Sequence, residues 1–323
     1  MTASPFKYIA LILIIFLLLI SVSCTKQNDS VDISARKVKV VATIGMITDA
    51  VKNVGGNRVE VIGLMGPGVD PHLYKASARD LGRMFDADII FYGGLHLEGK
   101  MADLFEKMQK RGKPAAAVSD GIERSMLLSS AQFQGAYDPH IWFDVALWMQ
   151  AVETIRDSLC KIDSKHSTIY EQNAQKYLGE LAELHEYVQV QVQKIPAKQR
   201  VLITAHDAFN YFGRAYGFEV RGLQGISTAA EAGTGDLRDL ADFIVERRIR
   251  AIFIESSIPI RNVEAVKAAV KSRGFDIIIG GELYSDAMGS KDTEDGTYIG
   301  MVKHNIDTIV GAHLDGIVKS EQE

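Results

Sequence analysis

Two copies of the tripeptide Asp-Pro-His, at 70–72 and 138–140, are the strongest chemical signal in the sequence. The proline before each histidine fixes φ and forces the preceding aspartate into an extended conformation, so each imidazole lies on a stiff, non-helical segment. A single copy could be a turn that carries a surface histidine. Two copies among only eight histidines instead indicate a shared role for His72 and His140.

Two further side chains with metal-binding chemistry are expected to follow strands in the second half of the chain. His206 comes directly after a predicted strand at 200–204, and Asp286 follows one at 276–279. Ligands of open α/β sheets bind beyond the carboxyl ends of the strands, so we expect both side chains to face a cleft. Three imidazoles and one carboxylate suit a divalent transition metal such as zinc or manganese. On spacing alone, the alternatives are a packing role for His206 and a capping role for Asp286.

Alternating strand and helix patterns surround these residues in both halves. Runs of β-branched residues alternate with segments whose apolar residues recur at steps of three and four, which predicts strands and amphipathic helices in turn. The alternation favours an α/β fold in which each half is a mainly parallel sheet flanked by helices. The predicted strands are 38–44, 59–64, 88–92, 200–204, 219–223, 251–255 and 276–279, and the predicted helices are 46–54, 76–85, 99–111, 141–161, 208–216, 237–247, 263–272 and 298–314.

One long amphipathic helix, 164–196, is predicted between the two halves. Asp163 is its expected N-cap, and Gly179 weakens it by only about 1 kcal/mol relative to alanine. We interpret it as a rigid connection between two lobes, 37–163 and 197–323, which should move little as a whole. The alternative is an ordinary packing helix inside one domain. The apolar residues that define its buried face are Tyr170, Ala174, Tyr177, Leu181, Leu184, Val188, Val192 and Ile195.

The N-terminus has the features of a secretory signal peptide. One lysine precedes an apolar run at 8–20, and small residues then lead to Cys24. The run is shorter than the roughly 20 residues that cross a bilayer, so an uncleaved anchor is the weaker alternative. We expect a lipoprotein-type signal peptide at 1–24, lipid on Cys24 and a flexible tether at 25–36. The pattern departs from the usual one at Ser21, where lipoproteins commonly have leucine.

Composition excludes one class of function and one source of stability. The 323-residue chain has 36 lysines and arginines against 41 aspartates and glutamates, a net charge of −5, and no basic cluster of the kind that binds nucleic acid. Cys160 is the only cysteine besides Cys24. Once Cys24 carries lipid, no intramolecular disulfide can form, and each lobe must be stabilised by its own core.

Several motifs, spread over nearly all of the chain after the tether, resemble a known family. They are the segments 43–47, 63–74, 94–98, 138–144, 225–233, 252–258, 280–289 and 296–305. As a set they are similar to the TroA-like metal-binding lipoproteins, the zinc and manganese solute-binding proteins of bacterial ABC importers. The resemblance implies two α/β lobes joined by a single long helix, with one metal ion held between them by His72, His140, His206 and Asp286.

The resemblance also implies a function. It indicates a monomeric extracytoplasmic receptor that captures zinc or manganese and delivers the ion to an ABC permease, without catalysis. Members dedicated to manganese carry glutamate where this chain has His206, and members dedicated to zinc often carry a histidine-rich loop, whereas 113–137 contains no histidine. Three imidazoles and one carboxylate favour zinc over a harder ion, although zinc binds more tightly than manganese at most such sites whatever the cargo is.

Two other functions are alternatives. A zinc-dependent hydrolase would use the same ligands but keep an open position for water beside a general base. A surface adhesin would need an exposed adhesive module or a repeat array, and the sequence shows neither. For the metal site itself, five further carboxylates are predicted as hydrogen-bond acceptors that could orient the imidazoles: Asp70, Asp138, Glu231, Glu255 and Glu282.

Overall fold

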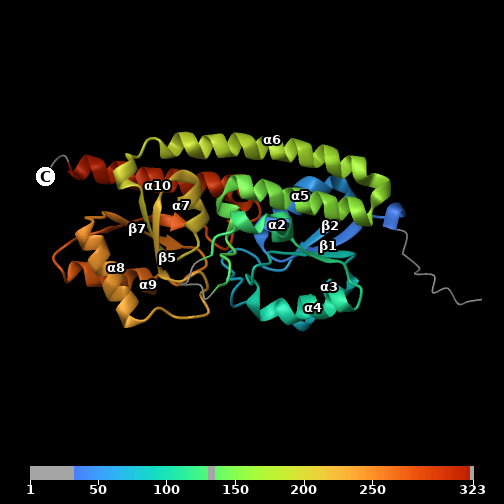
Figure 1. Ribbon diagram of the computed structural model, residues 1–323, viewed down its shortest axis with the longest axis horizontal. Coiled ribbons are helices and arrows are strands. Elements are labelled where there is room, and N and C mark those ends of the chain that lie inside the picture. The colour runs from blue at the N-terminus through green and yellow to red at the C-terminus, as the bar shows by residue number, and fades with distance from the viewer. Residues whose placement is uncertain (1–32, 130–134, 321–323) are drawn as a thin grey trace, which may run out of the picture. The chain divides into compact units, whose positions relative to one another are not determined.

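The computed structural model describes residues 33–129 and 135–320 of the chain (Figure 1). The predicted signal peptide and Cys24 lie outside these residues. None of the helices in the described ranges is long and apolar enough to span a membrane.

The end of the predicted tether has regular structure. Ile33–Ala35 form a 3-10 turn. Arg36 pairs with Asp88 at 2.6 Å, and Asp88 also accepts the backbone N–H of Lys39 at 2.8 Å. Arg36 therefore belongs to the compact unit that covers the rest of the chain, one residue before the predicted start of the first lobe.

The first sheet has four parallel strands in the order β2-β1-β3-β4. Val40 pairs with Val61 and Ile89 and is buried, and so is its neighbour Val41, because helices cover both faces of the sheet (Figure 1). The three strands predicted in this half are confirmed. The fourth was not predicted, since three alanines carry no strand pattern. The strands are β1 (Val38–Ala42), β2 (Val59–Gly63), β3 (Ile89–Tyr92) and β4 (Ala115–Ala117).

Side-chain caps set where two helices of the first half begin. Ser77 accepts the backbone N–H of Asp80, so α3 begins two residues later than predicted. Asp144 accepts the N–H of Ala146, and α5 begins after it, whereas Ile141–Phe143 form a separate 3-10 turn. The turn keeps the segment after His140 out of the helix. The helices are α2 (Gly45–Gly55), α3 (Ala78–Asp86), α4 (Ala102–Lys110) and α5 (Val145–Ile162).

The second half contains two parallel strand pairs, with β5 next to β7. Three of the strands extend further than predicted, β6 by a single residue. β5 includes His206 as its last residue, and β8 includes Glu282, so neither residue lies on a loop after a strand. The strands are β5 (Val201–His206), β6 (Glu219–Gln224), β7 (Ala251–Glu255) and β8 (Ile278–Leu283).

Four helices accompany these strands, and their apolar faces form the core of this half. Ile203 of β5 and Ile252 of β7 pack with Ile244 and Val266 from two of the helices. The two-lobe α/β architecture with parallel strands flanked by helices is thereby confirmed. The helices are α7 (Asn210–Tyr216), α8 (Thr234–Glu246), α9 (Arg261–Lys271) and α10 (Tyr298–Ser320).

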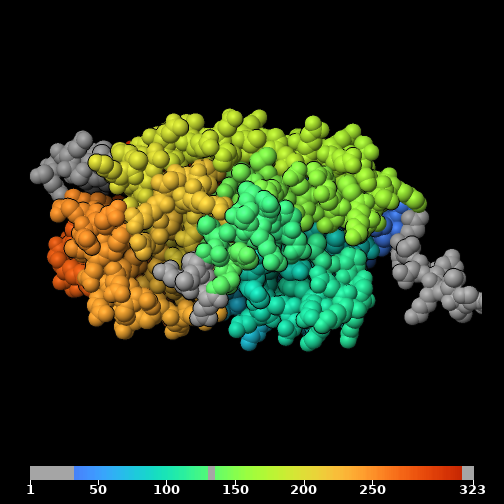
Figure 2. All heavy atoms as spheres, in the orientation of Figure 1, coloured from blue at the N-terminus to red at the C-terminus, as the bar shows by residue number. Residues whose placement is uncertain are grey.

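The connecting helix is α6 (Ser167–Val192), about 40 Å long at 1.5 Å per residue. All eight residues of its predicted face are buried, so the amphipathic pattern is confirmed. The predicted N-cap is wrong: a 3-10 turn at Ser164–His166 precedes the helix. The Asp163 carboxylate instead accepts hydrogen bonds from Arg58 at 2.8 Å and Tyr170 at 2.8 Å. In the space-filling view, α6 runs along one edge of both halves (Figure 2).

A second helix bridges the lobes. α10 lies alongside α6 (Figure 1), and Tyr187 of α6 donates its hydroxyl to Asp307 of α10 at 2.8 Å. At its first residue, Tyr298 donates its hydroxyl to the carbonyl of Trp142 at 2.7 Å and its N–H to Asp49 at 3.2 Å, both in the first half. The sequence predicted a single helix, α6, as the connection between the lobes, and the structure shows that α10 also connects them.

Candidate metal centre

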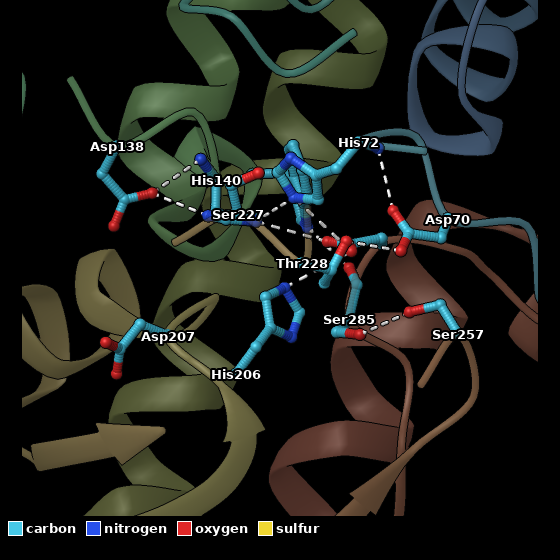
Figure 3. Close-up of polar contacts among 12 residues, drawn as sticks. Asp70, His72, Asp138, His140, His206, Asp207, Ser227, Thr228, Ser257 and Ser285 are labelled. Atoms are coloured by element: carbon cyan, nitrogen blue, oxygen red, sulfur yellow. Dashed lines mark hydrogen bonds and ion pairs between the residues drawn. The ribbon is translucent and has the colours of Figure 1, made fainter. Parts of the chain in front are cut away.

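Four buried side chains converge where the two halves meet. The Nε2 atoms of His72 and His140 lie 3.3 Å apart, and Nε2 of His140 lies 3.4 Å from Oδ1 of Asp286. Nε2 of His206 lies 3.3 Å from Oδ2 of Asp286. One donor atom from each residue falls within 4.8 Å of all the others, and Figure 3 shows the imidazoles directed toward a common point. The structure thus brings together the four residues that the sequence singled out.

These donor atoms lack ordinary partners. Nε2 of His206 and both carboxylate oxygens of Asp286 are buried without a hydrogen bond from any described residue. A buried polar atom normally has a partner, because leaving it without one costs free energy. Three imidazole nitrogens and a carboxylate oxygen around one point are a ligand set that suits a divalent transition metal. The donor set and its missing partners both fit a cation at this position.

Two carboxylates orient two of the rings. Asp138 accepts from Nδ1 of His140 at 2.7 Å and from its backbone N–H at 3.0 Å. Glu255 does the same for His206, at 2.6 Å from Nδ1 and 2.9 Å from the backbone N–H. When Nδ1 carries the proton, the lone pair of Nε2 faces the cluster. The predicted orienting roles of Asp138 and Glu255 agree with these contacts.

The other three predicted carboxylates behave differently. Asp70 accepts the backbone N–H of His72 at 2.8 Å rather than a ring N–H. Glu231 and Glu282 are exposed. The carbonyl of Glu282 is hydrogen-bonded to the ring of His304 at 2.9 Å, on β8 and away from the cluster. The structure therefore does not bring Glu231 or Glu282 to the imidazoles, and both predictions are corrected.

Burial and charge act against each other in this cluster. Burial lowers the pKa of His72 to about 3. Burial acts in the same direction on His140, but the charges of Asp138 and Asp286 outweigh it and raise the pKa of His140 to about 9. Burial favours the neutral form of Asp286, yet the neighbouring charge of His206 and the contacts with the imidazoles hold its pKa well below the usual range. The carboxylates thus stabilise positive charge at the centre of the cluster.

Several supporting residues were not predicted. Trp142 donates its indole N–H to the carbonyl of Ser285 at 3.0 Å, across the junction between the halves, and its ring lies 5.2 Å from that of His140. Asn210 donates to Oδ2 of Asp138 at 3.0 Å. The sequence could have indicated a role for Trp142, because this residue follows the second Asp-Pro-His within the same motif. No local pattern could have indicated Asn210, because its partner Asp138 lies 72 residues away in the sequence.

The chain is similar to several known metal-binding proteins. The chain is 54% identical over 276 residues to the zinc-binding protein TroA of Treponema pallidum, covering 85% of this chain and 89% of that protein. It is 45% identical over 286 residues to the manganese-binding lipoprotein MntA of Bacillus subtilis, covering 88% and 93%. The solved structure of the periplasmic zinc-binding protein TroA from Treponema pallidum superposes with a TM-score of 0.84 at 53% identity, covering 86% of this chain and 99% of that one. Residues 40–312 match the family ZnuA, described as zinc-uptake complex component A, periplasmic, and the chain belongs to that family.

Proposed function

We propose that this protein is the metal-binding receptor of an ABC importer, which captures one zinc or manganese ion and delivers it to a membrane permease. The observation that carries the proposal is the buried convergence of His72, His140 and His206 on a carboxylate, Asp286, whose oxygens accept no hydrogen bond from the part of the chain that the structure describes. One relative is named a zinc-binding protein and another a manganese-binding lipoprotein, which supports one of these two metals as the cargo. The three imidazoles favour zinc of the two.

A receptor fits this site better than a hydrolase does. Four protein ligands complete the tetrahedral shell that zinc prefers, whereas catalytic zinc sites have three protein ligands and a bound water. Two carboxylates beside the cluster, Asp138 and Glu255, are occupied with the rings of His140 and His206. Neither is free to act as a general base. We therefore propose binding and delivery without catalysis, by a monomer.

We propose the following organisation of the chain around that function. A signal peptide at 1–24 exports the protein, and lipid on Cys24 anchors it to the outer face of a membrane. The tether, which ends before Arg36, lets the folded part reach the permease. The lobes at 36–163 and 197–323 and the connecting helix at 164–196 then form the receptor itself. Relatives that are named lipoproteins support the anchor.

Isothermal titration with zinc and manganese tests the proposal. We expect one ion per chain, and an affinity loss of at least roughly a hundredfold for His72→Ala, His140→Ala, His206→Ala and Asp286→Ala, since removal of orienting groups alone costs 10–100-fold. His96→Ala is the matched control, because His96 is an exposed histidine outside the cluster. Wild-type affinity in any of the four ligand variants would show that the residue is not a ligand.

A further inference from the structure

A hydrogen bond joins the two lobes beside the cluster. The loop at 225–233 follows β6 in the second half, and its Thr228 is only 7% exposed. The hydroxyl of Thr228 donates to Oδ2 of Asp70 at 2.6 Å, and Oδ1 of the same carboxylate accepts the backbone N–H of His72 at 2.8 Å. Figure 3 shows this chain of contacts from Thr228 through Asp70 to His72. A residue of the second lobe thus acts on a ligand of the first through one carboxylate.

His72 is held less directly than the other two histidines. Carboxylates contact both the ring and the backbone of His140 and of His206. For His72, Asp70 contacts the backbone alone. The position of the His72 ring therefore depends on where Asp70 is held, and Thr228 is the side chain that holds the other oxygen of Asp70.

A cavity adjoins the same hydrogen bond. It has a volume of about 410 Å3, and its lining includes Asp70, Leu73 and Thr228 together with Ile258 and Arg261 from the second half. Leu73, the residue after His72, is 49% exposed. The residues on either side of the Pro71-His72 dipeptide, Asp70 and Leu73, therefore border this cavity.

We propose that Thr228 is a positioning residue that controls metal release, an inference that rests on the proposed function. While Thr228 holds Asp70, the segment 70–73 keeps His72 in the cluster. When the Thr228–Asp70 hydrogen bond breaks, this segment moves toward the cavity, His72 withdraws and the ion leaves by that side. Loss of the Thr228 hydroxyl removes no metal ligand. It should therefore raise the rate at which the ion dissociates and leave the rate at which the ion binds unchanged.

Stopped-flow measurement of zinc release to excess chelator tests this inference. We expect Thr228→Val, which keeps the shape but loses the hydroxyl, to release zinc about tenfold faster, the change expected from losing one hydrogen bond to a carboxylate. Thr228→Ser keeps the hydroxyl and should release zinc at the wild-type rate. Ser227→Ala is the matched control, since Ser227 lies on the same loop and its hydroxyl accepts a local N–H, that of Ala229, at 3.3 Å.

The outcomes separate this inference from the proposed function. A wild-type protein that binds neither zinc nor manganese contradicts the proposed function. A wild type that binds one zinc, with Thr228→Val releasing it within twofold of the wild-type rate, overturns the role of Thr228. Hydrogen exchange on zinc-loaded wild type gives a second test that needs no variant. Peptides covering 225–233 and 70–74 should open together, and independent opening would also overturn the proposal.

Discussion

Glu255 holds His206 through both of its carboxylate oxygens. Oε1 accepts the backbone N–H at 2.9 Å and Oε2 accepts Nδ1 at 2.6 Å. Both residues are buried, at the last positions of β7 and β5, which lie side by side. The second lobe therefore presents this imidazole from a strand end in a fixed orientation, rather than from a loop that must first become ordered.

Glu255→Gln should weaken zinc binding by about 10–100-fold, because the neutral amide no longer polarises the imidazole of His206. Competition titration against a chelator of known affinity measures the change. Glu282→Gln is the control, because Glu282 is an exposed glutamate on β8, and it should bind zinc like the wild type. Equal losses in the two variants would mean that overall charge, and not the contact with His206, sets the affinity.

Gly179→Ala should stabilise the protein by about 0.5–1 kcal/mol, since alanine is the better helix former. A Cβ at Gly179 in α6 would meet no atom within 4 Å. Urea unfolding measures the effect. Gly222→Ala is the opposite case, because its Cβ would collide with the backbone of His206, and it should destabilise the fold. A lower free energy of unfolding in Gly179→Ala would contradict the structure, because it would show that other atoms pack against α6 at Gly179.

Asp163→Asn should cost on the order of 3 kcal/mol at pH 7, because it breaks a buried ion pair. Burial raises the pKa of Asp163, but its hydrogen bonds with Arg58, His166 and Tyr170 outweigh burial and lower the pKa overall. A carboxyl with a lowered pKa stabilises the fold at pH values above its unfolded pKa of about 3.9, and this contribution is lost as the pH falls through the folded value.

The difference between wild type and Asp163→Asn should therefore shrink below about pH 4. Unfolding free energies measured from pH 3 to 7 test this. Asp157→Asn, at a side chain that is 70% exposed, is the control and should cost little at any pH. A difference that stays constant down to pH 3 would contradict the assignment.

Cys24 should be the first residue of the mature protein and should carry lipid. Mass spectrometry of the N-terminus and membrane fractionation measure this. Cys24→Ser should move the protein out of the membrane fraction, whereas Cys160→Ser, at the only other cysteine, should not. An unmodified mature N-terminus at another position would contradict the prediction.

The two lobes should move little when metal binds. α6 has no internal proline, and α10 adds a second bridge, because Tyr298 at its first residue contacts Trp142 and Asp49 of the first half. Bending either helix sharply would break backbone hydrogen bonds. Small-angle scattering should give the same radius of gyration with and without zinc. Asp286→Ala treated with zinc serves as the control for effects of the ion itself. A clear change in the wild type alone would show that the helices act as a hinge.

Local chemistry made much of this protein predictable. The apolar face of α6, including Tyr170 and Val188, could be recognised because helix periodicity is a property of neighbouring residues. The two Asp-Pro-His tripeptides also carry their signal within three residues, since proline restricts the backbone on both sides. For the same reason, His72 and His140 could be proposed as metal ligands before the fold was known.

Contacts between distant segments were decided only by the tertiary structure. Glu231, Glu255 and Glu282 look alike in the sequence, yet of these three carboxylates only that of Glu255 contacts an imidazole of the cluster, because β7 lies beside β5 and the two strands end together. Asp163 lies where an N-cap is expected, but its carboxylate accepts a hydrogen bond from Arg58, which is 105 residues away in the sequence. Thr228 and Asp70 form a hydrogen bond although 158 residues separate them in the sequence. Such pairings follow from which strands and loops become neighbours, and that depends on the packing of the whole chain rather than on any local pattern.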